Sequence, residues 1–231
     1  MSPKFNLHTT PDYTRIVPGP KYNFFNKPFG IRHWMEHGLN LPAQMHQFEK
    51  TIVVIMDPDQ FLLRPFVQDL TKEEEVWQEP SGHTVVKKGQ PMGAGYAFGG
   101  GWIAKLDVEE LMNLNTTTKV PKEESGLAHK ETWNAGYVGQ NFAVGPPYVS
   151  VVSDMFDIVT TWSEFVVPIH HQLQGGFNSE MYGYCTAAAH LKLPHRISSS
   201  FMISAPTDMR NEAWRSWIDN RTSEQVCDLD M

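Results

Sequence analysis

The chain has 231 residues, with 19 basic and 26 acidic side chains and a formal net charge of −7. This balance argues against nucleic-acid binding, because no basic stripe occurs along the sequence. There is no run of roughly 18 apolar residues and no apolar segment near the N-terminus, so neither a transmembrane helix nor a signal peptide is predicted. The length and a hydrophobic content of 41% fit one globular domain.

The first predicted element after a polar, proline-containing lead-in (residues 1–20) is a helix between Asn26 and Gly38. Asn26 is a good cap residue, Pro28 falls in the first turn, and Gly38 follows the last apolar residue of the segment. The apolar residues between them recur at helical spacing, which predicts an amphipathic helix.

The next stretch, TIVVIMDPDQFLLRP over residues 51–65, begins as a strand and then places two carboxylates one residue apart. Its continuous β-branched residues predict a strand that is buried on both faces. If the chain stays extended, Asp57 and Asp59 point the same way at the end of this strand, where they would suit Mg²⁺ or Mn²⁺ shared with substrate phosphates. The alternative is a plain turn, since Asp and Pro are common turn residues.

The middle of the chain is rich in polar residues and glycine. Residues 69–92 predict a surface loop, and the glycine-rich segment 89–102 lacks the spacing of a dinucleotide or P-loop fingerprint. A short helix is predicted over residues 107–114 and a polar loop over residues 115–135. The segment 144–153 predicts a turn followed by a buried strand.

The last third of the sequence predicts two helices and a strand. Asp154 is expected to cap a helix over residues 155–167 that Pro168 ends. A second helix lies within residues 175–190, with Glu180 in its first turn, where the helix dipole favours a carboxylate. A strand-like run follows over residues 194–204.

Alternating helices and strands predict a single mixed α/β domain over residues 21–218, followed by a polar tail over residues 219–231. The only cysteines are Cys185 and Cys227, and the sequence does not decide whether they form a disulfide.

Six short motifs occur in a fixed order along the chain: Asn26-Lys27-Pro28, Trp34, Asp57-Pro58-Asp59, Arg64-Pro65, Glu180-Met181-Tyr182 and Phe201-Met202-Ile203. In this order they resemble the plant and algal peptide glycosyltransferases of the hydroxyproline O-arabinosyltransferase and peptidyl serine α-galactosyltransferase group. The resemblance covers the chain from about Pro11 to Trp217, and its ordered set is more specific than any single motif. More distantly, the order of helix, strand and paired aspartates is similar to that of glycogenin-type enzymes of the GT-A fold.

The resemblance implies a GT-A-like fold and a retaining transferase. It would move arabinofuranose or galactose from a UDP-sugar to hydroxyproline or serine of a secreted or cell-wall protein, in the Golgi or endoplasmic reticulum. The relatives carry an earlier β-α-β segment that holds the uridine base, and this chain is expected to lack it. Membrane attachment is therefore expected only through a segment outside this chain.

The resemblance also implies roles for individual residues. Asn26 and Lys27 would approach the donor phosphates or sugar, and Glu180 would lie under the donor sugar as the catalytic residue. Asp57 and Asp59 would hold Mn²⁺ (or Mg²⁺) and, through it, the diphosphate. A third metal ligand would be His195, with His190 as the alternative.

Two other readings of the sequence stay open. In one, the chain is a non-catalytic relative that binds sugar or peptide with an incomplete donor site. In the other, it is an unrelated α/β protein in which Asp57 and Asp59 belong to a turn. For Lys27 and Glu180 the ordinary alternatives are a solvated lysine at a helix start and a surface carboxylate that pairs with the helix dipole.

Overall fold

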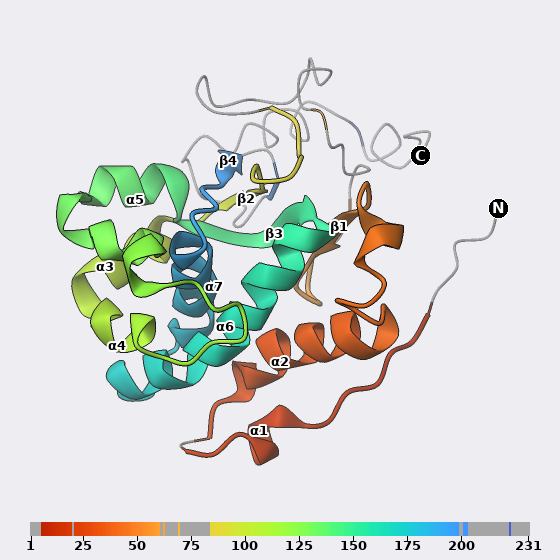
Figure 1. Cartoon of the computed structure of the whole chain (residues 1–231), viewed down its shortest axis with the longest axis horizontal. Coiled ribbons are helices and arrows are strands. Elements are labelled where there is room, and N and C mark those ends of the chain that lie inside the picture. The colour runs from red at the N-terminus through yellow and green to blue at the C-terminus, as the bar shows by residue number, and fades with distance from the viewer. Residues whose placement is uncertain are drawn as a thin grey trace.

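The computed structural model describes residues 6–19, 21–60, 62, 69, 84–198, 201–202 and 222. These residues form a mixed α/β structure in which helices flank a four-stranded mixed sheet (Figure 1). The strands are β1 (Ile52–Ile55), β2 (Met92–Gly95), β3 (Val144–Val151) and β4 (Arg196–Ser198). The α-helices are α1 (Tyr13–Ile16), α2 (Asn26–His33), α3 (Trp102–Lys105), α4 (Val108–Met112), α5 (Ala135–Asn141), α6 (Val152–Gln172) and α7 (Ser179–His190).

Short helical turns join these elements. A π-helical turn, η2 (Trp34–Gly38), continues α2 directly. The others are the 3-10 helices η1 (Asn23–Phe25), η3 (Met45–Phe48), η5 (Ala97–Gly100), η6 (Lys122–Glu124) and η7 (Gly126–Thr132). None of the helices in the described part of the chain combines the length and the apolar character that crossing a bilayer requires.

The sheet has the strand order β1-β3-β2-β4, so β3 lies between β1 and β2 and is buried along its whole length. It runs antiparallel to both neighbours, whereas β2 and β4 are parallel. The prediction that the first strand is covered on both faces is wrong. β1 lies at an edge of this sheet, and its burial alternates because only Val53 and Ile55 face the helices.

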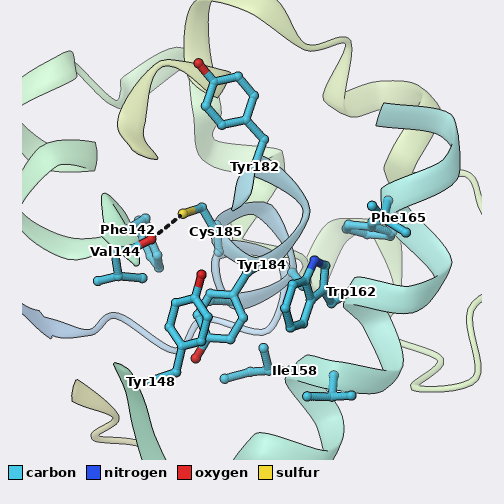
Figure 2. Packing of buried hydrophobic residues seen from close by; sticks show 14 of the residues in the cluster. Phe142, Val144, Tyr148, Ile158, Trp162, Phe165, Tyr182, Tyr184 and Cys185 are labelled. Atoms are coloured by element: carbon cyan, nitrogen blue, oxygen red, sulfur yellow. Dashed lines mark hydrogen bonds between the residues drawn. The ribbon is translucent and has the colours of Figure 1, made fainter. Parts of the chain in front are cut away.

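Helices α6 and α7 pack against each other under the sheet, and α2 packs on α6 (Figure 1). The centre of this packing is aromatic. The rings of Tyr148 and Tyr184 stack with centroids 3.6 Å apart, and the Trp162 ring meets Tyr184 edge-on at 5.2 Å (Figure 2). These rings join β3, α6 and α7 in one core.

The helix α6 begins earlier and ends later than predicted. Asp154 lies in its first turn instead of capping it, and its Oδ2 accepts a hydrogen bond from the Gly89 amide at 2.5 Å. Pro168 lies inside the helix, which continues to Gln172. A proline removes one backbone hydrogen bond, but Ile169 beyond it is fully buried, and this packing holds the last turn in place.

Cys185 is a buried free thiol whose Sγ donates to the carbonyl oxygen of Val144 (Figure 2). Cys227 lies outside the described residues, as do the predicted Arg64-Pro65 motif and, except for Thr222, the polar tail over residues 219–231. Of the lead-in, residues 6–19 are described, and they contain the short helix α1.

Acid should weaken the fold through His190, which is 1% exposed and pairs through Nδ1 with the Ser125 hydroxyl at 2.8 Å. Burial lowers the pKa of His190 from 6.5 to about 4. The pKa of His190 is therefore lower in the folded chain than in the unfolded chain. Neutral His190 contributes its full stabilisation of the fold above pH 6.5, and this contribution is lost as the pH falls through 4. The free energy of unfolding should therefore fall between pH 7 and pH 4. We expect urea unfolding to show that this fall is about 3 kcal/mol smaller in His190→Gln than in the unmodified chain.

The matched control for this prediction is His129→Gln, because His129 is an exposed histidine of η7. That variant should keep the full pH dependence. Equal losses in the unmodified chain and in His190→Gln would contradict the prediction.

Candidate functional site

Three of the predicted site residues come together although they are far apart in the sequence. The ammonium Nζ of Lys27 lies 2.6 Å from Oδ1 of Asp57 and 3.0 Å from Oε1 of Glu180. One lysine therefore bridges two carboxylates, which come from the end of β1 and the start of α7. With both acids ionised the cluster has a net charge of −1.

Local structure places each member of this cluster. Lys27 is in the first turn of α2, which begins after the aromatic turn η1. Glu180 is the second residue of α7, so its carboxylate lies near the positive end of that helix dipole. Asp57 lies two residues beyond the last residue of β1, and its amide donates to the side-chain oxygen Oε1 of Gln60.

The backbone of Glu180 is held from two sides. Its amide donates to the Tyr22 hydroxyl at 2.9 Å, and that hydroxyl donates to the carbonyl oxygen of Phe177 at 2.7 Å. Its carbonyl oxygen accepts from Nε1 of Trp162 at 2.7 Å. These contacts fix the start of α7 against α6 and against the turn that precedes α2.

The cluster has an aromatic wall. The ammonium of Lys27 lies 5.6 Å from the Tyr148 ring centroid and 5.9 Å from that of Trp162, within the range of cation–π attraction. The side chain of Lys27 is 18% exposed, and that of Glu180 is 11% exposed. Low exposure strengthens the ion pairs, because solvent screens them only weakly.

The carboxylate of Glu180 is in an environment that disfavours its charge. Burial raises its pKa above the ordinary value of 4.5, Lys27 opposes this shift, and Asp57 adds to it. A buried carboxylate with a raised pKa beside a specific charge partner is a common feature of functional sites.

The two aspartates do not lie on an extended chain, so the expectation that both point the same way is wrong. Residues 57–60 form a turn, closed by a hydrogen bond from the Gln60 amide to the Asp57 carbonyl oxygen at 3.0 Å. Pro58 explains it, since its fixed φ suits the second position of a turn. Asp57 is half-buried and paired with Lys27, while Asp59 is exposed.

His195 has its ring contacts in the core. Nε2 lies 2.9 Å from the Tyr184 hydroxyl, and Nδ1 lies 3.0 Å from the Leu193 carbonyl oxygen. His190, the alternative ligand, pairs with Ser125. Within the described ranges, no three His, Cys, Asp or Glu side chains gather as a metal-binding group, so the structure does not bring either histidine to the aspartates.

Asn26 is exposed and holds the lead-in segment in place. Its Oδ1 accepts from the Tyr13 amide at 2.7 Å, and its Nδ2 donates to Oδ1 of Asp12 at 3.3 Å. With Lys27 it lines an open depression of about 390 Å³ between the lead-in segment and α2. The other lining residues are Asn6, His8, Thr10, Gly30, Ile31 and Trp34.

Sequence reasoning missed three residues that shape the site. Tyr22, Tyr148 and Trp162 position Glu180 or lie against Lys27. Nothing in their spacing marks them, because their roles depend on contacts between distant segments. Their only signal in the sequence is that they are aromatic residues near predicted elements.

Comparisons with known proteins add no relative: no protein-family model, no curated protein and no solved structure matches this chain.

Proposed function

We propose that this chain is a metal-dependent retaining glycosyltransferase that moves a sugar from a UDP-sugar to hydroxyproline or serine of a secreted protein. The observation that carries this proposal is the convergence of Lys27, Asp57 and Glu180. Each belongs to a different segment of the ordered resemblance to peptide glycosyltransferases. Segments 30 and 123 residues apart (27 to 57, and 57 to 180) contribute to one charged cluster, as a shared site requires.

The chemistry of the cluster suits transfer from a nucleotide diphosphate. Lys27 supplies a partly buried positive charge that can bind a phosphate. Glu180 supplies a fixed negative charge beside the aromatic wall, where it can stabilise positive charge that develops on the donor sugar. In this proposal Asn26 contributes at the edge of the depression and not within the ion-pair cluster.

The donor set fits a divalent cation in chemical type. Asp57 and Asp59 provide carboxylate oxygens in one turn, and Mg²⁺ or Mn²⁺ commonly uses one or two carboxylates with substrate phosphates and water as further ligands. Such an ion would neutralise charge on the leaving diphosphate. Asp59 is accessible to it, and Asp57 would exchange Lys27 for the ion.

The proposed fold is GT-A-like, with β1 as the strand that leads into the aspartates. A preceding β-α-β segment of the kind that the resemblance implies would extend the sheet from the β1 edge and supply a uridine pocket. The Golgi or endoplasmic reticulum is the proposed location, because the proposed acceptors are secreted proteins.

A second candidate function is metal-independent binding of sugar or peptide by a non-catalytic relative. The observation that favours it is the 2.6 Å ion pair between Lys27 and Asp57, which already neutralises the half-buried aspartate without a metal ion. In that case Asp59, being exposed, would have no part in binding.

The experiment is calorimetric titration of UDP into the chain with and without Mn²⁺, repeated on Asp59→Asn. We expect binding that requires Mn²⁺ and that is weakened about tenfold or more in the variant, because a metal-ligand oxygen is lost. Glu49→Gln is the control, since it removes one exposed acidic charge from another part of the surface and should bind normally.

Titration of sugar and of peptide, beside UDP, distinguishes the two candidate functions. Sugar or peptide binding of equal strength without Mn²⁺, together with no binding of UDP, would support the non-catalytic relative. Absence of both would reject the two candidate functions for this chain.

A further inference from the structure

A group of three histidines lies outside the charged cluster, where the lead-in segment crosses the end of α2. Nε2 of His8 is 2.9 Å from Nδ1 of His33, and the two ring centroids are 5.1 Å apart. The rings of His33 and His37 have centroids 4.4 Å apart. Two segments of the chain, 25 residues apart at their closest pair, therefore bring three imidazoles together.

The backbone presents the second pair on one side of the helix. His33 is the last residue of α2, and His37 lies four residues further on, within η2. Histidines four residues apart share a helix face and form a common two-ligand arrangement for zinc. The π-helical turn η2, which contains His37, is a feature often found at functional sites.

His8 is seated against this pair by packing. A side-chain atom added at Gly38 would overlap the Trp34 ring and lie 3.4 Å from Nδ1 of His8, so the His8 ring lies directly beside Gly38 at the end of the helix. His8 also lines the open depression beside α2, and so remains accessible from solvent.

The group consists of imidazole side chains alone. Imidazole nitrogen is a ligand that suits zinc, copper and nickel. Glu36 is engaged by Arg32, whose Nε lies 2.8 Å from its Oε1, so it is not counted as a ligand.

We propose that His8, His33 and His37 form a binding site for a late transition-metal ion such as Zn²⁺, which ties the lead-in segment to α2. Two imidazole nitrogens on one tetrahedral zinc lie about 3.3 Å apart, given Zn–N bonds of about 2.0 Å. The His8 and His33 nitrogens share a hydrogen bond at 2.9 Å, so their rings lie close enough that a turn of the rings would direct both nitrogens at one ion. As they stand, no three ligand side chains in the described parts of the chain converge, so His37 must turn its exposed ring to complete the set.

This site uses other ligands than the proposed transferase site, although His8 lines the same depression as Asn26 and Lys27. Its ligands are nitrogen atoms, which suit zinc, copper and nickel, whereas Asp57 and Asp59 offer oxygen atoms, which suit Mg²⁺ and Mn²⁺. The two sites can therefore be told apart by the identity of the atoms that bind the metal.

The first test uses the untagged, chelator-treated chain and isothermal titration with Zn²⁺. We expect one tight site per chain, with affinity reduced about tenfold or more in His8→Ala and in His33→Ala. His46→Ala is the control, because His46 is exposed on η3 and should have no effect. Asp59→Asn should also keep the full affinity, which separates this site from the transferase site.

The second test identifies the ligand atoms. Electron paramagnetic resonance of the chain with one equivalent of Cu²⁺ should show coupling to at least two nitrogen nuclei, and this coupling should be lost in the His8→Ala, His33→Ala double variant. Circular dichroism shows whether each variant is folded, and His8→Ala, in the lead-in segment, keeps the test valid if His33→Ala does not fold. Zinc affinity unchanged in folded His8→Ala, or no binding by the unmodified chain, would overturn the proposal.

Discussion

Glu180→Gln is expected to reduce sugar transfer by about 10²-fold or more while leaving the fold intact. In the proposed reaction the charge of Glu180 stabilises positive charge on the donor sugar, and a single preorganised electrostatic contact contributes on this order. The amide has nearly the same shape, and its oxygen can take the position of Oε1, 3.0 Å from Nζ of Lys27. Release of UDP from the UDP-sugar with a peptide acceptor is the measurement of activity.

The charge environment of Glu180 also determines how Glu180→Gln changes the free energy of unfolding. Because burial raises the folded pKa of Glu180, the neutral form is favoured in the folded chain, and this contribution is lost as the pH rises through the folded pKa. Glutamine stays neutral and avoids that loss, although it gives up the ion pair with Lys27. We expect unfolding free energies at pH 7 within about 1 kcal/mol of each other.

Glu124→Gln is the matched control for Glu180→Gln, because Glu124 is an exposed glutamate of η6. It should change neither activity nor stability. A loss of activity in Glu180→Gln that is accompanied by a large drop in unfolding free energy would indicate a structural role for Glu180 and would contradict a catalytic one.

Gly126→Ala is expected to destabilise the fold by about 3 kcal/mol. A side-chain atom added at Gly126 would overlap the carbonyl oxygen of Ala189, which belongs to the backbone of α7 and cannot turn away as a side chain can. Relief requires η7 and α7 to separate, and this would open the buried region around Leu127. Urea unfolding measures the effect.

Gly139→Ala is the matched control. Gly139 is an exposed residue of α5, and an added side-chain atom there would have no neighbour within 4 Å. Since alanine favours a helix, we expect a gain of about 0.5–1 kcal/mol. A Gly126→Ala variant as stable as the unmodified chain would contradict the close contact between η7 and α7.

The elements that the sequence predicted well have strong local signals. The helix predicted between Asn26 and Gly38 appears as α2 and η2, although Asn26 is its first residue and not its cap. The run that begins at Thr51 contains β1, and the segment with Glu180 forms α7. Each combines an apolar pattern with a boundary residue, so local propensity and packing favour the same structure.

Elements that depend on distant partners were missed. The strand β2 consists of Met-Gly-Ala-Gly, which has little strand propensity, and it forms because β3 and β4 pair with it on either side. The position of β1 at an edge was missed for the same reason, since pairing between strands is not visible in either strand alone.

The candidate site was predicted in part. Lys27, Asp57 and Glu180 come together as the resemblance implies. The other three predicted residues lie elsewhere. Asn26 lies beside the cluster, Asp59 is exposed in the turn, and His195 packs against Tyr184 in the core. The carboxylates were found because acids stand out after an apolar run. His195 was misplaced because histidine occurs both as a metal ligand and as a hydrogen-bonded core residue, and the sequence does not distinguish the two.

The Tyr22 hydroxyl, which joins the Glu180 amide to the Phe177 carbonyl oxygen, has a consequence for how a ligand would be received. It ties the first turn of α7 to the segment that leads into α2 and Lys27. The charges of Lys27 and Glu180 are therefore held in a fixed relative position. A substrate would therefore meet dipoles and charges already oriented, and little reorganisation energy would be spent in aligning them during a reaction.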